Sequence, residues 1–493
     1  MQFFRKGVPL RIFFTKLGKG EHTMKKLAFL LAFILLMTPV LVACGSAETD
    51  TTAVNGAAQE TEYEYNMSEA GELDYGAKKF GIFGVRGSMA YVMAEEETGD
   101  LVNDAVFQRN IAVEEAYNLT FDMFEAEPNV GADMIKNFVL SGDTTYQLYQ
   151  ATQHNGLPEM ILNDYFVDWT QLEAVKFDRP YWNSKGVKDI NFGGKIYTIG
   201  GDINLVTYNS TNCILFNQKL FDDLGIDYPY EDVYNKTWTI DKMIEIVKQG
   251  YLDLNGDSEW SAATDRAGYS GWGYENLYAI YVGMGGKSLV NDENNLPVLA
   301  MDGERTVKLI DKMIELFDGT NAWTNFEDHS IDKKMFTDGR LLMDDSMITG
   351  ISANRDSEFD IGLLPYPMLD EAQGEYFSRA ANIAHLSYIP TMNTDYKSTG
   401  IILEGMAIQS YNTVRPTYYD VTLSLKEAAD EETLDMVDIV LGSSSYLYEG
   451  FITPSKLNGF ITSKTNTWAS WYAGQRKGFE KNVEKKILPF YTK

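Results

Sequence analysis

Aromatic residues placed beside glycines are the part of this chain best suited to chemistry, and that chemistry is binding. The chain carries 30 Tyr and 8 Trp, and a core supplies few partners for so many hydroxyl and indole N–H groups. In Ser270-Gly271-Trp272-Gly273-Tyr274 the glycines leave the rings exposed. Aromatic faces stack on the apolar C–H faces of sugar rings, so these positions predict sugar-like contacts. The aromatic candidates are Trp182, Tyr208, Trp272, Tyr274, Trp468 and Trp471.

Polar side chains occupy comparable loops after strand-like runs. Open α/β sheets bind ligands at the carboxyl ends of their strands, where amides and carboxylates can hydrogen-bond hydroxyl groups. The polar candidates are Gln153, His154, Asn155, Asp202, Asn204, Arg379 and Asn382. For every aromatic or polar candidate, ordinary packing or a solvated loop is the alternative.

Catalytic constellations are not evident. His154, His329 and His385 lack metal-ligand spacing, and no Gly-x-Ser-x-Gly elbow occurs. The run Gly285-Gly286-Lys287-Ser288 resembles the end of a phosphate loop, but Tyr281 stands where its first glycine belongs. The 71 acidic residues offer many carboxylate pairs for glycoside hydrolysis without singling one out. We therefore expect no enzyme, with a glycoside hydrolase as an alternative.

One acidic loop has the oxygen ligands of a calcium loop at alternating positions. These are Asp253, Asn255 and Asp257, but Ser258 replaces the usual glycine and Thr264 the usual glutamate. A structural calcium ion and an acidic turn are the two interpretations. No other cofactor is expected.

The N-terminal region predicts export and lipid attachment. Residues 24–26 form a positive head, and the eleven apolar residues 27–37 are too short to span the ~30 Å of a bilayer core. Leu41-Val42-Ala43-Cys44 resembles the lipobox of bacterial lipoproteins, which implies lipid on Cys44. We expect residues 1–23 to be a mis-called start, 24–43 a signal peptide and 44–77 a flexible tether. The localisation expected is the extracellular face of a Gram-positive type cell membrane.

Composition restricts the partners. The formal net charge of −29 at pH 7 would repel phosphate backbones and anionic lipids, so we expect no nucleic-acid binding and no electrostatic membrane docking. Membrane attachment then depends on acyl chains at Cys44. With Cys44 lipidated, Cys213 has no disulfide partner and is predicted to be a small buried hydrophobe.

The order of elements predicts an α/β fold. A strand near 80–85, a helix over 104–117 and a strand over 119–124 open a βαβ unit. Further strands are predicted at 146–149, 193–199, 211–217, 341–343 and 359–364. Further helices are predicted at 157–163, 218–224, 240–248, 304–317, 401–411, 418–429 and 433–441.

Several motifs occur in a fixed order along the chain. They include Gly194-Lys195-Ile196-Tyr197, Phe216-Asn217-Gln218-Lys219-Leu220-Phe221, Leu224-Gly225-Ile226, Lys236-Thr237-Trp238-Thr239, Phe336-Thr337-Asp338-Gly339-Arg340 and Leu403-Glu404-Gly405-Met406. From about residue 78 to the C-terminus this combination resembles the family-1 extracellular solute-binding proteins, the lipoprotein receptors of carbohydrate ABC importers. Phe216 departs from the tyrosine usual in that family, which puts any hydroxyl contact there in doubt.

The resemblance implies a two-lobed periplasmic-binding-protein-like fold of type II, with mixed sheets flanked by helices and a hinge between the lobes. Lobe 1 is expected over 78–202 plus 383–414, and lobe 2 over 203–382 plus 415–493. Crossings are expected near Gly201-Asp202-Ile203, near Ala380-Ala381-Asn382 and over 412–416. The implied function is capture of a carbohydrate by a monomer and its delivery to ABC permease subunits. A polysaccharide adhesin is a further alternative.

Overall fold

The computed structural model describes residues 65–152, 157–190, 193–319, 323–325, 330–354, 357–381, 384–421, 431–446 and 454–492. All of these belong to one unit, Glu64–Lys493. The predictions for the leader, for Cys44, for Gln153, His154 and Asn155, and for Asn382 lie outside the described residues. Within the described ranges, no helix combines the length and apolarity needed to cross a bilayer.

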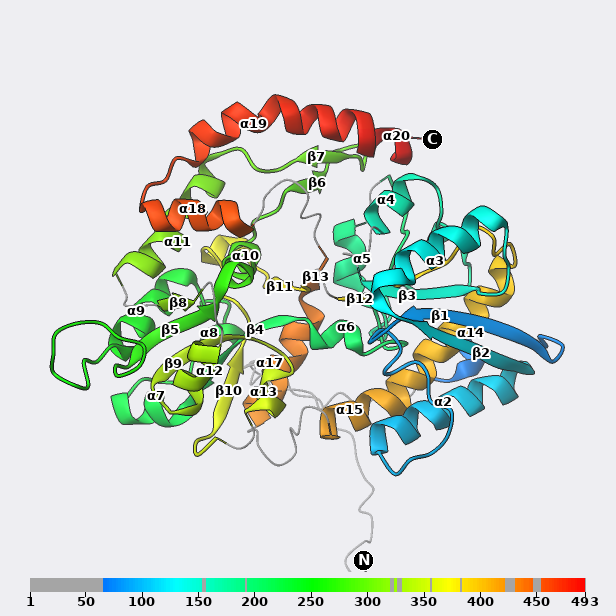
Figure 1. The fold of residues 1–493 in the computed structure, drawn as a ribbon, viewed down its shortest axis with the longest axis horizontal. Helices are drawn as coiled ribbons and strands as arrows, with labels where there is room; N and C mark the ends of the chain where they lie inside the picture. Colours follow the sequence, from blue (N-terminus) through cyan, green and yellow to red (C-terminus); the bar gives the residue numbers. More distant parts are fainter. Residues whose placement is uncertain are drawn as a thin grey trace, which may run out of the picture. The chain divides into compact units, whose positions relative to one another are not determined.

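A four-stranded sheet organises what we call lobe 1. Its order is β12-β3-β1-β2. Here β1 (Lys78–Val85) runs parallel to β2 (Leu119–Ala126) and β3 (Leu148–Thr152), and β12 (His385–Tyr388) runs antiparallel to β3. The helices α2 (Leu101–Tyr117), α3 (Pro128–Ser141) and α14 (Tyr396–Gln409) accompany this sheet (Figure 1). The predicted opening βαβ unit is confirmed as β1-α2-β2.

A five-stranded mixed sheet organises lobe 2, in the order β10-β4-β9-β5-β8. Its strands are β4 (Asn212–Asn217), β5 (Ala267–Trp272), β8 (Trp323–Asn325), β9 (Leu341–Met347) and β10 (Ile361–Leu364). Strand β5 is parallel to β8 and β9, whereas β4 is antiparallel to β9 and β10. The accompanying helices are α7 (Gln218–Leu224), α8 (Tyr230–Tyr234), α9 (Ile240–Gly250), α10 (Gly273–Gly283), α11 (Glu304–Gly319), α12 (Ser330–Thr337), α17 (Glu431–Gly442), α18 (Pro454–Ser463) and α19 (Trp468–Asn482).

Two small sheets complete the strands. β11 (Ser378–Arg379) pairs in parallel with β13 (Ser444–Ser445), and β6 (Leu289–Asn291) forms a hairpin with β7 (Pro297–Leu299). The remaining elements are η1 (Met67–Glu69), α4 (Leu157–Leu162), η2 (Trp169–Gln171), α5 (Ser184–Ile190), α6 (Val206–Asn209), α13 (Gly350–Ala353), η3 (Glu371–Gln373), η4 (Ser410–Val414), α15 (Arg415–Val421), η5 (Val483–Ile487) and α20 (Leu488–Tyr491).

Local sequence explains how lobe 2 begins. The Asn217 side chain accepts the Leu220 amide and so caps α7, which ends at Gly225 with φ 66°. Only glycine adopts this left-handed conformation at no cost. The prediction of a turn followed by a strand over 193–199 is wrong for the strand. Ile199 makes a single bridge with Ser387, and the other residues of this segment form no ladder with a neighbouring strand. Instead, the Ile196 carbonyl accepts the Trp169 amide.

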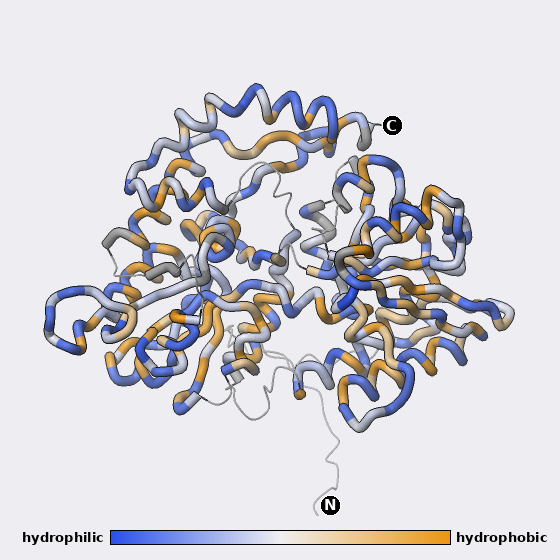
Figure 2. Tube along the Cα trace, viewed as in Figure 1, coloured by the Kyte–Doolittle hydropathy of each residue, from blue (hydrophilic) through white to orange (hydrophobic). Residues whose placement is uncertain are grey.

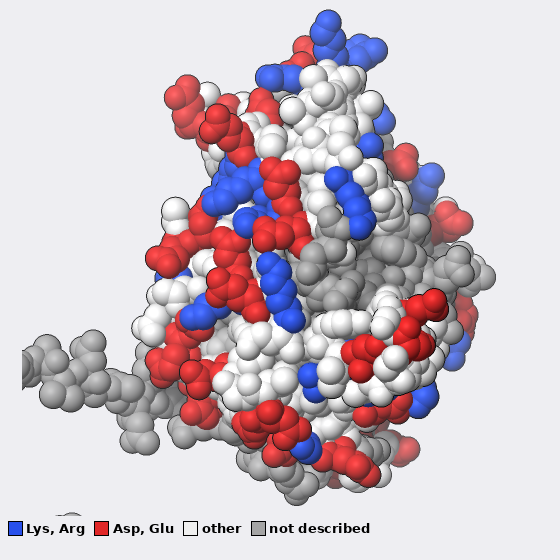
Figure 3. All heavy atoms as spheres, turned by 90° about the vertical axis from the view of Figure 1, so that its left-hand side faces the viewer, with Lys and Arg blue, Asp and Glu red and all other residues white. Residues whose placement is uncertain are grey.

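Each sheet has its own apolar layer. Figure 2 shows hydrophobic residues concentrated along the strands, with hydrophilic residues on the outer sides of the helices. The buried Cys213 lies in the lobe 2 core, as predicted. Acidic and basic side chains are interleaved over the left-hand face of the molecule (Figure 3). The ion pairs of lobe 2 include Arg305–Asp370 and Lys312–Asp241.

All four strands of the lobe 1 sheet and all five of the lobe 2 sheet fall inside the residue ranges expected for each lobe. The exact boundaries stay a prediction.

Candidate functional site

The direction of the strands shows which edge of each sheet is the candidate ligand-binding edge. In lobe 1 the carboxyl ends of β1 and β3 share an edge with the start of β12, because His385 is paired with Thr152. In lobe 2 the start of β4 shares an edge with the carboxyl end of β9, because Asn212 is paired with Met347. Ligands of α/β proteins bind at such edges. The chain segment 199–211, which we call the first crossing, joins one edge to the other.

Asn204 anchors the first crossing to lobe 1. Its Nδ2 donates to the Ser88 carbonyl at 2.7 Å and to Gln150 Oε1 at 3.0 Å. Gln150 in turn donates to Ser387 Oγ at 2.8 Å. Asn204, predicted as a ligand contact, thus has its amide N–H groups engaged inside the protein, where only 2% of the residue is exposed.

Asp202 and Tyr208, two further candidates, bind each other. The Tyr208 hydroxyl donates to Asp202 Oδ1 at 2.8 Å, and Arg415 Nη1 lies 3.5 Å from Asp202 Oδ2. Burial raises the pKa of Asp202 to about 6, although Arg415 and Tyr208 pull it down. The carboxylate therefore holds the first crossing against α15, which follows a second connection between the lobes, η4.

Trp182 and Trp468 are enclosed in protein. Trp182 Nε1 donates at 2.9 Å to Glu404, a buried carboxylate that also accepts from the Tyr181 hydroxyl at 2.6 Å. Trp468 is 1% exposed and donates to the Met301 carbonyl at 2.9 Å. Trp471 packs beside Trp468 with ring centroids 5.0 Å apart.

The remaining candidates lie near the lobe 2 edge. Arg379, on β11, lies 2.6 Å from a Glu275 carboxylate oxygen, and its guanidinium stands 5.0 Å from the centre of the Tyr278 ring. Trp272 ends β5 and Tyr274 is the second residue of α10, so both backbones are at the carboxyl end of a strand. Their side chains lie outside the described part of the structure.

The acidic loop is internally hydrogen bonded. Asp253 accepts the amides of Gly256 and Ser258, and these bonds lower its pKa. Asn255 and Asp257 likewise accept backbone amides. Among the described residues, no group of three or more acidic, histidine or cysteine side chains is arranged to hold a metal. Calcium binding at this loop stays a prediction.

Several buried polar atoms at the two edges lack a hydrogen-bond partner. They are Ser88 Oγ and His385 Nδ1 in lobe 1, and Asn212 Oδ1 and Asn276 Nδ2 in lobe 2. Burying such groups unpaired costs free energy, so each calls for an explanation. A polar ligand or ordered water at the facing edges would supply partners.

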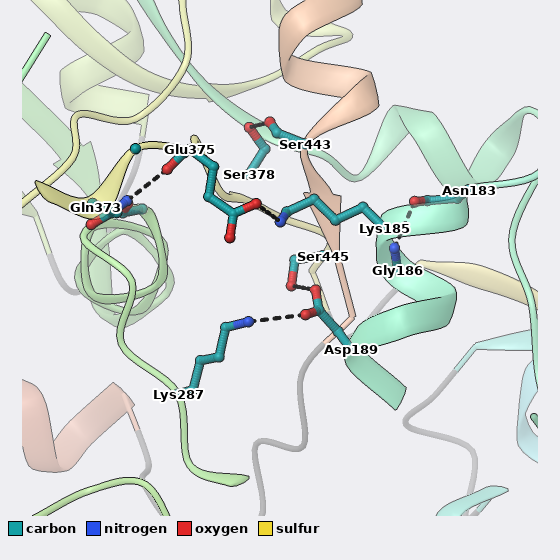
Figure 4. Close-up of polar contacts among 12 residues, drawn as sticks. Asn183, Lys185, Gly186, Asp189, Lys287, Gln373, Glu375, Ser378, Ser443 and Ser445 are labelled. Carbon is teal, nitrogen blue, oxygen red and sulfur yellow. Dashed lines mark hydrogen bonds and ion pairs between the residues drawn. The ribbon is translucent and has the colours of Figure 1, made fainter. Parts of the chain in front are cut away.

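A seam of charged contacts between the lobes was not predicted from the sequence. In Figure 4, Lys185 reaches Glu375 and Lys287 reaches Asp189, each pair 3.0 Å apart. Lys185 and Asp189 belong to α5 of lobe 1, whereas Lys287 and Glu375 belong to lobe 2. No sequence signal pairs residues this far apart in the chain.

Comparison with known proteins gives the fold. No family model matches the chain, and no curated protein matches it. A cyclo/maltodextrin-binding protein complexed with maltotetraose matches with a TM-score of 0.55 and 10% identity over 83% of this chain and 97% of that one. The maltose-binding periplasmic protein MalE from Listeria monocytogenes, in complex with maltose, matches with a TM-score of 0.50 and 12% identity over 83% and 99%. UspC from M. tuberculosis matches with 0.50 and 11% over 74% and 89%.

The fold class is therefore that of the type II periplasmic binding proteins, with two lobes and mixed sheets flanked by helices, as predicted.

Proposed function

We propose that this chain is an extracellular receptor that binds a carbohydrate between its lobes and delivers it to the permease of an ABC importer. The observation that carries the proposal is the pair of sheet edges joined by the first crossing, in a fold shared with a protein complexed with maltotetraose. The unpartnered polar atoms on both edges suit a ligand rich in hydroxyl groups.

The proposed contacts are candidates that stand next to strand ends in the sequence. They comprise Gln153, His154 and Asn155 after β3, Trp272 and Tyr274 at and after the end of β5, and Asn382 before β12. The proposal extends to a lipid on Cys44, the signal sequence, permease partners and a monomeric state, which rest on the sequence motifs alone.

Binding would act by closing the lobes. Moving a population from 1:99 to 99:1 requires a preference for the closed state of ~5.5 kcal/mol. Stacked rings at ~0.5–1.5 kcal/mol each, together with net hydrogen bonds of about 1 kcal/mol each, are enough to supply it.

A thermal-shift screen of the purified mature chain against mono- and oligosaccharides, including maltose and maltotetraose, tests the proposal. A ligand at 100 times its Kd should stabilise the fold by ~2.7 kcal/mol, and chromatography should find the saccharide unchanged. Trp272→Ala should weaken binding, whereas Trp260→Ala, at a tryptophan whose ring is tilted against Tyr251 in lobe 2, should not. Cleaved products would support the glycoside hydrolase, and binding of polymers alone the adhesin.

A further inference from the structure

One short stretch of lobe 1 contacts three separate pieces of lobe 2. The stretch comprises α5 and the turn at Gly193. Lys185 Nζ lies 3.0 Å from Glu375, Asp189 lies 3.0 Å from Lys287, and the Gly193 amide donates at 2.5 Å to the Asn295 carbonyl at the tip of the β6–β7 hairpin. All three contacts therefore join the two lobes.

The two ammonium groups share one aromatic ring. Lys185 Nζ lies 3.9 Å and Lys287 Nζ 4.5 Å from the centre of the Phe377 ring, which is 5% exposed. A cation over a ring face is attracted to it, more so when partly desolvated. The side chains of Lys287 and Asp189 are only 25% and 9% exposed. This pair is consequently less screened by salt than a pair on the open surface.

Both sides of the seam are held rigidly. Asn183 accepts the Gly186 amide at the start of α5 (Figure 4). The Asn183 amide group donates in turn to the Tyr446 hydroxyl. Strand β13, which lies in the range expected for lobe 2, also contacts α5, because the Ser445 hydroxyl donates to Asp189. On the lobe 2 side, the Gln373 side chain donates to the Glu375 carbonyl at 3.0 Å. Pre-positioned partners lose little side-chain entropy when they pair.

We propose that Lys185–Glu375 and Asp189–Lys287, together with the Gly193–Asn295 hydrogen bond, form an ionic latch that holds the lobes together without ligand. The latch opposes the repulsion expected within a chain of net charge −29. Its role in uptake rests on the proposed function: a lobe arrangement populated before binding lowers the differential affinity that the ligand must provide.

Small-angle X-ray scattering of the ligand-free mature chain tests the latch. Lys185→Met with Lys287→Met keeps the apolar stems on Phe377 and removes only the charges. The radius of gyration of this variant should be larger than that of the wild type at 50 mM NaCl. Hydrogen exchange of the Gly193 amide should become faster in the variant.

Two controls keep the result interpretable. Lys219→Met removes a charge paired with Asp223 inside α7 and should leave the radius unchanged. Lys185→Glu alone should increase the radius of gyration. Adding Glu375→Lys, which swaps the two charges, should restore the wild-type radius. An unchanged radius and unchanged Gly193 exchange in the double Met variant would overturn the latch. Because no saccharide is present, that outcome is independent of whether the receptor function holds.

Discussion

Asp202 of the first crossing and Arg415 at the start of α15 meet in an ion pair 3.5 Å long, with the Asp202 side chain fully buried. Arg415 also lies 3.7 Å from Asp438 on α17 and stands over the rings of Tyr411 and Tyr419. The ion pair thereby links two connections between the lobes, the first crossing and the segment that leads into α15, at one buried point. We therefore expect any opening of the lobes to pivot at this point.

Arg415→Met should be strongly destabilising. The substitution leaves the Asp202 carboxylate buried without a cation, which typically costs ~3–5 kcal/mol. Urea unfolding followed by tryptophan fluorescence measures this loss. Arg476→Met is the matched control, because Arg476 and its partner Asp302 are half exposed and such pairs contribute only ~0–1 kcal/mol. Equal losses of unfolding free energy in the two variants would show that the buried Asp202–Arg415 pair stabilises the fold no more than an exposed pair.

His385 should make the protein sensitive to acid. Burial at the start of β12 lowers its pKa to about 4, against a contribution from the Gly87 backbone that raises it. Between about pH 6.5 and pH 4 the unfolded chain therefore binds a proton that the folded chain does not. The stability that His385 contributes is fully present above about pH 6.5 and is lost as the pH falls toward 4, by roughly 3–3.5 kcal/mol in all.

His385→Gln should remove that dependence. Urea titration at pH 7.5, 6.5, 5.5 and 4.5 measures the unfolding free energy of the wild type and the variant. As the pH falls, the wild type should lose more stability than the variant. A difference that is constant over the series would contradict the lowered pKa.

Glu404 should prove to be a structural carboxylate. It lies fully buried on α14, accepts from Tyr181, Trp182 and the Lys176 amide, and burial raises its pKa. Glu404→Ala would leave these donors unpaired in the interior, each at a cost of ~1–3 kcal/mol. Thermal denaturation should show a loss much greater than that of Glu114→Ala on α2, whose carboxylate accepts only the Phe121 amide.

The motifs in the sequence predicted the fold because they encode turns and caps. Asn217 caps α7, Gly225 ends it, Lys236 takes a positive φ of 58°, and Trp238 donates to the Pro365 carbonyl. These are local events that chain neighbours specify. They say nothing about which ligand lies between the lobes.

The site was harder to predict because burial and partners are decided by tertiary packing. The sequence predicted Trp272 in a loop after a strand-like run, whereas the structure has it as the last residue of β5. Nothing in the sequence indicated that Trp182 would bond to Glu404 or that Lys185 would reach Glu375. An exposed ring and a buried ring look alike in a sequence when both follow a strand-like run.

Trp468 offers a direct test of core against ligand contact. Its ring packs against Phe460 and Tyr281, and its N–H donates to the Met301 carbonyl. Trp468→Phe removes that donor and part of the packed volume, so the unfolding free energy should fall by ~1–3 kcal/mol. Trp471→Phe, next to it but half-buried, should cost less. Because Trp468 is buried in the lobe 2 core, the Kd for any saccharide found in the screen should be the same in both variants as in wild type. A weaker Kd in Trp468→Phe alone, with the melting temperature preserved, would instead assign this ring to the ligand.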